Sequence, residues 1–111
     1  MNEKLDTKAV SSSSKGYWIV LSKINNPAGF GPYQAAAMPT IASFGGRAIA
    51  RGDVLEVVEG NIPDRPYLIE FPSYAAAKDC FHSAKYQEAI VLRSGVAQFN
   101  IVIVEGVKPE A

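Results

Sequence analysis

Residues 65–86 read RPYLIEFPSYAAAKDCFHSAKY, a stretch that predicts a strand running directly into a helix, with a second helical segment behind it. Apolar side chains alternate from Tyr67 to Phe71, which is the period of two of a β-strand. Pro72 cannot donate a hydrogen bond to a sheet, so the strand ends there. The hydroxyl of Ser73 is placed to cap the first turn of the helix that follows.

Helical spacing continues on both sides of Ser83. Before it, Tyr74, Ala77 and Phe81 recur on one apolar face. Ser83 then caps a second segment, which Gly95 interrupts. The members of this segment at helical spacing are Tyr86, Ala89, Ile90 and Arg93.

The upstream half of the chain predicts a strand at 17–21 and then a helix that starts at Gly31-Pro32. Gly45 stands where a helix C′ residue is expected, and Pro39 predicts a kink or a short break inside the helix. A second strand is expected at 46–51.

Arg47, Ile49 and Arg51 are expected to share one face of this second strand. An extended segment at 54–58 is expected to continue the strand after a turn. The last strand is expected at 99–104.

This order of elements is that of the ferredoxin-like split βαβ fold (βαββαβ), an α+β fold whose antiparallel sheet carries its helices on one face. The strands at 17–21 and 99–104 are apolar on both faces, so the second face of the sheet also needs a cover. A second copy of the same sheet is the simplest cover, and it gives a two-fold homodimer, a dimeric α/β barrel.

Length and composition limit the class of protein. The 111 residues suit one domain, expected at 17–107, with a disordered tail at 1–16 and a short one at 108–111. Eleven basic and eleven acidic residues give no net charge, which argues against a nucleic-acid partner. No apolar run reaches the roughly 20 residues of a membrane span. The single cysteine, Cys80, predicts no disulfide, and we expect a cytoplasmic protein.

Several short motifs occur in a fixed order along the chain: Gly45-Gly46-Arg47, Ala50-Arg51-Gly52, Glu59-Gly60, Ile69-Glu70-Phe71-Pro72-Ser73, Ala76-Ala77 and Ser83-Ala84-Lys85-Tyr86-Gln87. Taken together, they resemble the DUF1330 family over about residues 17–107. The resemblance implies a fold of the dimeric α/β-barrel group and no assigned reaction, since the family is named for its unknown function. This chain has Cys80 where the family usually has tryptophan, and Ala84 where it usually has proline. The first departure is expected to reshape any cavity under the second helix.

Glu70 is expected on a central strand, where a carboxylate is costly unless it is paired. Arg47 and Arg51 are the natural partners, because a guanidinium binds a carboxylate in a fork. Two interpretations remain open. The three residues form a structural ion pair, or one arginine grips an anionic ligand while Glu70 moves a proton.

Three further residues are candidates for ligand binding. His82, the only histidine, lies near a helix end, with Tyr86 one turn onward. Arg93 either caps its helix or points into a cleft. Cys80 follows an apolar stripe and is expected to be a buried, inert thiol. No pair of residues has zinc-ligand spacing and no glycine-rich loop fits a phosphate, so we expect neither a metal nor a cofactor.

The sequence thus predicts a homodimer with a small-molecule cleft, suited to an anion, between sheet and helices. The alternative is a non-enzymatic structural or binding dimer in which Arg/Glu pairs are buried for stability. Whether the protein is an enzyme is left open. An RNA-binding sheet is set aside, because 47–51 has basic flanks and no aromatic residue.

Overall fold

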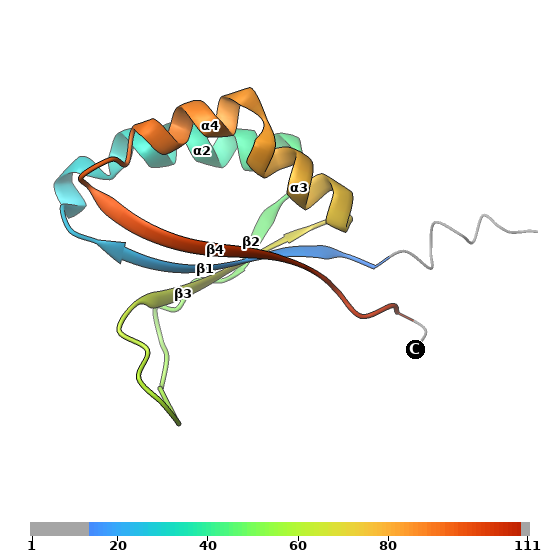
Figure 1. Cartoon of the computed structure of the whole chain (residues 1–111), viewed down its shortest axis with the longest axis horizontal. Coiled ribbons are helices and arrows are strands. Elements are labelled where there is room, and N and C mark those ends of the chain that lie inside the picture. The colour runs from blue at the N-terminus through green and yellow to red at the C-terminus, as the bar shows by residue number, and fades with distance from the viewer. Residues whose placement is uncertain (1–13, 110–111) are drawn as a thin grey trace, which may run out of the picture.

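The computed structural model describes residues 14–109 and is a four-stranded antiparallel sheet with helices on one face (Figure 1). The strands are β1 (Gly16–Ile24), β2 (Arg47–Ala50), β3 (Arg65–Phe71) and β4 (Ala97–Glu105). The helices are α2 (Gly31–Ser43), α3 (Tyr74–His82) and α4 (Ala84–Val91), with a 3-10 turn η1 (Pro27–Gly29) before α2. The sheet order is β2-β3-β1-β4, which confirms the ferredoxin-like α+β topology.

The expected tail at 1–16 lies almost wholly outside the described residues, although Gly16 already belongs to β1. Residues 110 and 111 of the expected 108–111 tail are likewise outside them. No helix within residues 14–109 is long and apolar enough to cross a membrane.

The local signals that the sequence shows in residues 65–86 are confirmed. Strand β3 ends at Phe71, directly before Pro72. The Ser73 hydroxyl accepts a hydrogen bond from the Ala76 amide at 3.0 Å and so caps α3. Ser83 caps α4 in the same way, accepting from the Tyr86 amide at 3.2 Å.

Helix α2 is continuous from Gly31 to Ser43 with Pro39 inside it, so the short break expected there does not occur. Gly45 has a φ of 80°, and the amides of Gly45 and Gly46 donate to carbonyls of the last helical turn. This left-handed end to the helix was predicted and is favoured by glycine, which has no Cβ.

The strand expected at 54–58 is a wrong prediction. Residues 52–64 form a loop between β2 and β3, here called the β2–β3 arm, which extends from the sheet on the side opposite the helices (Figure 1). Strand β2 is the edge of the sheet, so within residues 14–109 no further strand is present to pair with this segment. Val54 is 97% exposed and Val58 is 83% exposed, which leaves the alternating apolar residues uncovered.

The core lies between the sheet and the helices and is centred on Trp18 of β1, which is 1% exposed. Its indole N–H donates to the Ala77 carbonyl of α3 at 2.9 Å. Rings of Phe71, Phe81 and Tyr86 lie around the indole, with centroids 5.0 to 5.8 Å away. The indole thus joins β1 to both α3 and α4.

The other side of the sheet, here called the open face, has no helix over it (Figure 1). Ile19 of β1 lies opposite Leu68 of β3 and Val102 of β4, and these three apolar side chains form a row across it. Val102 is 52% exposed. The apolar second face that the sequence predicted is therefore present, with nothing in residues 14–109 packed over it as a layer.

Candidate functional site

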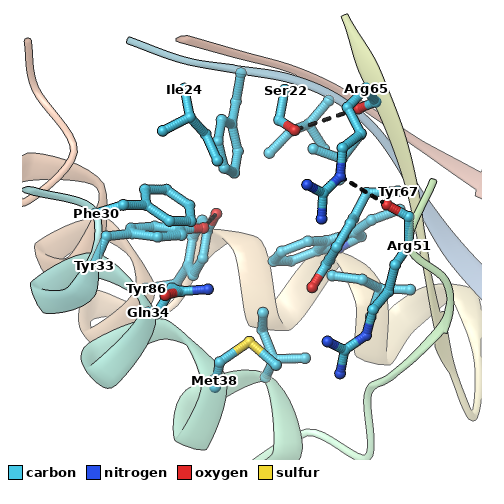
Figure 2. Close-up of a pocket in the computed structure, with 16 residues that line it drawn as sticks. Ser22, Ile24, Phe30, Tyr33, Gln34, Met38, Arg51, Arg65, Tyr67 and Tyr86 are labelled. Carbon is cyan, nitrogen blue, oxygen red and sulfur yellow. Dashed lines mark hydrogen bonds between the residues drawn. The ribbon is translucent and has the colours of Figure 1, made fainter. Parts of the chain in front are cut away.

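A cavity of about 200 Å³ lies between α2 and the sheet (Figure 2). Strands β1, β3 and β4 supply its floor, helix α2 its roof, and α4 one tyrosine. Six aromatic and six aliphatic side chains make up most of the lining, and arginines lie at one side. The lining residues are Trp18, Val20, Ser22, Ile24, Phe30, Tyr33, Gln34, Met38, Ile41, Arg51, Arg65, Tyr67, Ile69, Tyr86, Phe99 and Ile101.

The aromatic side of the pocket is held rigidly by ring packing. The ring centroids of Phe30 and Tyr33 are 5.4 Å apart, and those of Tyr33 and Phe99 are 5.5 Å apart. The guanidinium of Arg93 lies 4.4 Å from the Phe99 centroid and 5.2 Å from that of Tyr33. A cation over two ring faces adds electrostatic attraction to the packing and fixes this wall of the pocket.

Two tyrosine hydroxyls meet at this wall. The phenol oxygens of Tyr33 on α2 and Tyr86 on α4 are 2.6 Å apart, in a buried hydrogen bond. Burial is the main cause that raises the pKa of both phenols. For Tyr33, the neighbouring Tyr86 raises the pKa further. Both hydroxyls therefore stay protonated near neutral pH and act as hydrogen-bond donors rather than bases.

The opposite side of the pocket carries positive charge. Figure 2 shows the side chains of Arg51 and Arg65 beside Tyr67, across the pocket from Tyr33 and Phe30. Arg65 is held in place: its Nε donates to the Arg51 carbonyl at 3.0 Å, and its guanidinium pairs with Asp53 at 3.0 Å. The Arg51 guanidinium forms no ion pair within residues 14–109. The two arginines, balanced by one carboxylate, leave a net positive charge at this side of the pocket.

The structure divides the six predicted site residues between separate places. Only Arg51 and Tyr86 line the pocket. Arg47 and Glu70 lie on the open face, where their side chains pair at 3.3 Å. Arg47 is 74% exposed there, and Tyr17 donates to the second Glu70 oxygen at 3.2 Å.

Arg47 and Arg51 were expected to share a face of β2, and that prediction is wrong. The pairing of β2 with β3 shifts register between Ala48 and Ala50. Such a bulge re-aims the residues that follow it. Arg51 consequently lies at the pocket, whereas Arg47 stays beside Glu70.

His82 and Arg93 are not brought together with the other candidates. His82 is exposed at the end of α3, with its ring against Phe81. The Tyr86 hydroxyl, its expected partner, is bonded to Tyr33 instead. Arg93 reaches the back of the pocket wall without lining the cavity.

Cys80 is fully buried, as predicted, and burial raises the pKa of its thiol to about 12. It does not line the pocket. No aspartate, glutamate, histidine or cysteine lines the pocket. Within residues 14–109, no three such side chains are grouped as metal ligands.

Sequence reasoning missed Tyr33, Arg65, Tyr67 and Phe99 as pocket residues. The inward alternation of β3 and β4 was visible, but it does not distinguish a filled core from a cavity. The available signal was Arg65, two positions before Tyr67, because residues two apart in a strand share a face and a cation beside an inward aromatic fits a pocket rim.

The fold and the pocket define the class: this is a ferredoxin-like α+β protein with an aromatic pocket bounded by arginines. Residues 15–107 match the family described as "Domain of unknown function (DUF1330)", and the chain belongs to this family. The comparison with curated proteins found no match.

Solved structures with the same fold were found. One, RPA0582 from Rhodopseudomonas palustris, a protein of unknown function, is similar with a TM-score of 0.64 and 17% identity, over 98% of this chain and 97% of that one. The methylated form of RPA0582 gives a TM-score of 0.65 and 18% identity, over 89% and 85%. SnoaB, a cofactor-independent oxygenase from Streptomyces nogalater, gives 0.54 and 10%, over 86% and 96%. At these identities the likeness concerns the fold.

Proposed function

We propose that this protein is a cytoplasmic homodimer that binds a small organic anion in the pocket between α2 and the sheet. The observation that supports this proposal most is the pairing of an aromatic cavity with two arginines on one of its sides. Apolar walls with a few convergent polar groups are typical of small-molecule sites. The cavity, of about 200 Å³, suits a ligand smaller than a drug-sized molecule.

The charge of the ligand follows from the arginines. Arg51 has no carboxylate partner among the described residues. Arg65 pairs with one carboxylate, that of Asp53 in the β2–β3 arm. A carboxylate is the group that a guanidinium binds in a bidentate manner. The ligand is therefore an organic acid whose apolar part lies among the rings.

The homodimer is supported by the open face. Its apolar row and the exposed valines of the β2–β3 arm lie on the same side of the sheet. An apolar surface of this kind is normally covered, and a two-fold axis brings the same patch of a second copy against it. The free, buried Cys80 supports a location that does not require disulfides, and we place the protein in the cytoplasm.

The groups in the pocket favour binding over acid–base catalysis. The titratable side chains that line it are arginines and tyrosines, and the two paired phenols are donors near neutral pH. Glu70, the predicted proton carrier, is on the other face. A purely structural dimer is the alternative, and the cluster of Arg47, Glu70 and Tyr17 on the open face is the observation that favours it.

The experiment is isothermal titration of the protein with benzoate, and with benzamide as the uncharged analogue. We expect benzoate to bind and benzamide to bind at least about tenfold more weakly, because a hydrogen bond to a charged group contributes about 1.5–3 kcal/mol. Arg51→Gln should weaken benzoate binding by a similar factor. Arg47→Gln, a matched change on the open face, should not. No binding of benzoate, or equal effects of the two variants, would reject the ligand site and favour the structural dimer.

A further inference from the structure

The pocket has polar groups at two opposite sides, and most of its other lining residues are apolar. Figure 2 shows Arg51 and Arg65 on one side and the hydroxyls of Tyr33 and Tyr86 on the other. If the arginines bind the carboxylate of a ligand, as proposed above, the far part of that ligand must face the phenol pair. The chemistry of this pair therefore defines what the far part of the ligand carries.

The phenol pair has one proton more than its own hydrogen bond uses. Each hydroxyl carries a proton and can also accept, and the bond of 2.6 Å between Tyr33 and Tyr86 takes up one proton only. No other hydrogen bond from either phenol is formed within residues 14–109. Tyr86 is 0% exposed and Tyr33 is 6% exposed, so almost no water reaches the pair, and Tyr33 is the phenol with accessible surface. A buried donor without an acceptor costs free energy, and an acceptor in the pocket removes that cost.

The apolar part of the pocket is suited to binding an aromatic ring. Trp18, Phe30 and Phe99 line the pocket, and their rings are fixed by contacts with one another or with the tyrosines. Aromatic rings packed at fixed angles bind a further ring in offset or edge-to-face contact. A cavity of about 200 Å³ leaves room for one ring with a substituent at each end rather than for a fused system.

We infer that the ligand of this pocket is a single-ring aromatic carboxylate that carries a hydrogen-bond-accepting oxygen at the end remote from its carboxylate. The carboxylate binds Arg51 and Arg65, the ring lies between the aromatic walls, and the remote oxygen accepts the free phenol proton. This inference rests on the proposed function, since it assumes that the arginines hold the acid group.

The test compares two acids of nearly equal shape, 4-acetylbenzoate and 4-isopropenylbenzoate, by isothermal titration. They differ in having C=O or C=CH₂ at the remote end, so only the first offers an acceptor. We expect the acetyl compound to bind about three- to tenfold more tightly, which is the range of a net neutral hydrogen bond. A variant with both Tyr33→Phe and Tyr86→Phe should lose this preference and bind the isopropenyl compound as the wild type does.

The double variant is chosen because it removes both members of the pair and leaves no hydroxyl unpaired, so the fold should be preserved. Either single variant would leave one phenol free to donate. Tyr67→Phe is the matched control, since it removes a pocket hydroxyl on the arginine side. It should leave the preference for the acetyl compound unchanged.

The outcomes separate this inference from the proposed function. Equal binding of the two acids, lost in Arg51→Gln, would overturn the inference and leave the anion site standing. A preference that survives in the double variant would also overturn it. Failure of benzoate to bind would overturn the site and the inference together, and failure of both substituted acids while benzoate binds would overturn the inference alone.

Discussion

The two faces of the sheet are made by the same strands but differ in what covers them. Trp18 and Ile19 are neighbours in β1, yet the indole of Trp18 lies in the core while Ile19 lies in the row on the open face. The helices of this chain cover the first face and leave a cavity in it. The second face is left to a second copy in our proposal. The difference shows that a period of two distributes apolar side chains to both faces but does not say what covers them.

The two arginines of the β2 region, Arg47 and Arg51, show the same contrast between the two faces of the sheet. Arg47 pairs with Glu70 on the open face, where a largely exposed ion pair contributes little to stability. Arg51, only four positions onward, lies at the pocket, because the bulge between Ala48 and Ala50 changes the face. One irregularity in register therefore separates a charge on the open face from a charge at the pocket.

The largest expected effect comes from the covered face. Trp18→Ala removes an indole that contacts three rings and leaves the Ala77 carbonyl without its donor. We expect the free energy of unfolding to fall by about 3–5 kcal/mol in urea titrations, as for other buried large-to-small changes. Ile19→Ala, one residue on, should cost much less at protein concentrations low enough to keep the chain monomeric. Equal losses would show that the open face is as well packed in the monomer as the covered one.

The next effect concerns the open face alone. Val102→Glu should raise the dissociation constant of the dimer, by about 2 kcal/mol or more in free energy, because a charge would be buried in each copy. Light scattering across a dilution series measures this change. Val91→Glu is the matched control, since Val91 is also an exposed apolar residue, on α4. A wild-type chain that is monomeric at all concentrations would contradict the proposed dimer.

The phenol pair of the covered face predicts a pH dependence. The folded state holds the protons of Tyr33 and Tyr86 more tightly than the unfolded chain does, because both pKa values are raised. Stability is therefore unaffected by these groups below the unfolded pKa of about 10 and falls as the pH rises above it. The slope is about 1.4 kcal/mol per pH unit for each phenol.

Urea unfolding at several pH values up to 11 measures this decline. The variant with both tyrosines replaced by phenylalanine is the reference, since it keeps every other titrating group. Its free energy of unfolding should fall less steeply above pH 10 than that of the wild type. Parallel curves would mean that the two phenols titrate alike in the folded and unfolded chains.

The smallest expected effect lies at the start of α4. Ala84 is the first helical residue, where proline is well tolerated, and Ser83 before it has a ψ of 150°, which suits a residue that precedes proline. Ala84→Pro should raise the free energy of unfolding by about 0.4–1 kcal/mol by restricting the unfolded chain. Thermal unfolding of this variant and the wild type measures the change. Destabilisation would show that α4 needs the Ala84 amide or a different backbone angle.

Much of the fold could be predicted from particular residues because their signals are local. Pro72 and Ser73 mark the end of a strand and the cap of a helix within a few bonds, and Gly45 marks a helix end by its backbone freedom. The order of the elements then leaves few topologies. The expected strand at 54–58 was wrong, because pairing depends on a neighbour that a local pattern does not contain.

The site depended on contacts between distant parts of the chain. The sequence by itself determined the order of strands and helices, the caps, the two-sided apolar strands and the inert, buried Cys80. Only the tertiary structure decided that Tyr33 meets Tyr86 across 53 positions, that Arg51 and Arg65 come together at a cavity, and that Glu70 is on the other face. The physical reason is that caps and periods act over a few residues, whereas a pocket is defined by the packing of elements far apart in sequence and by a bulge that no composition signal marked.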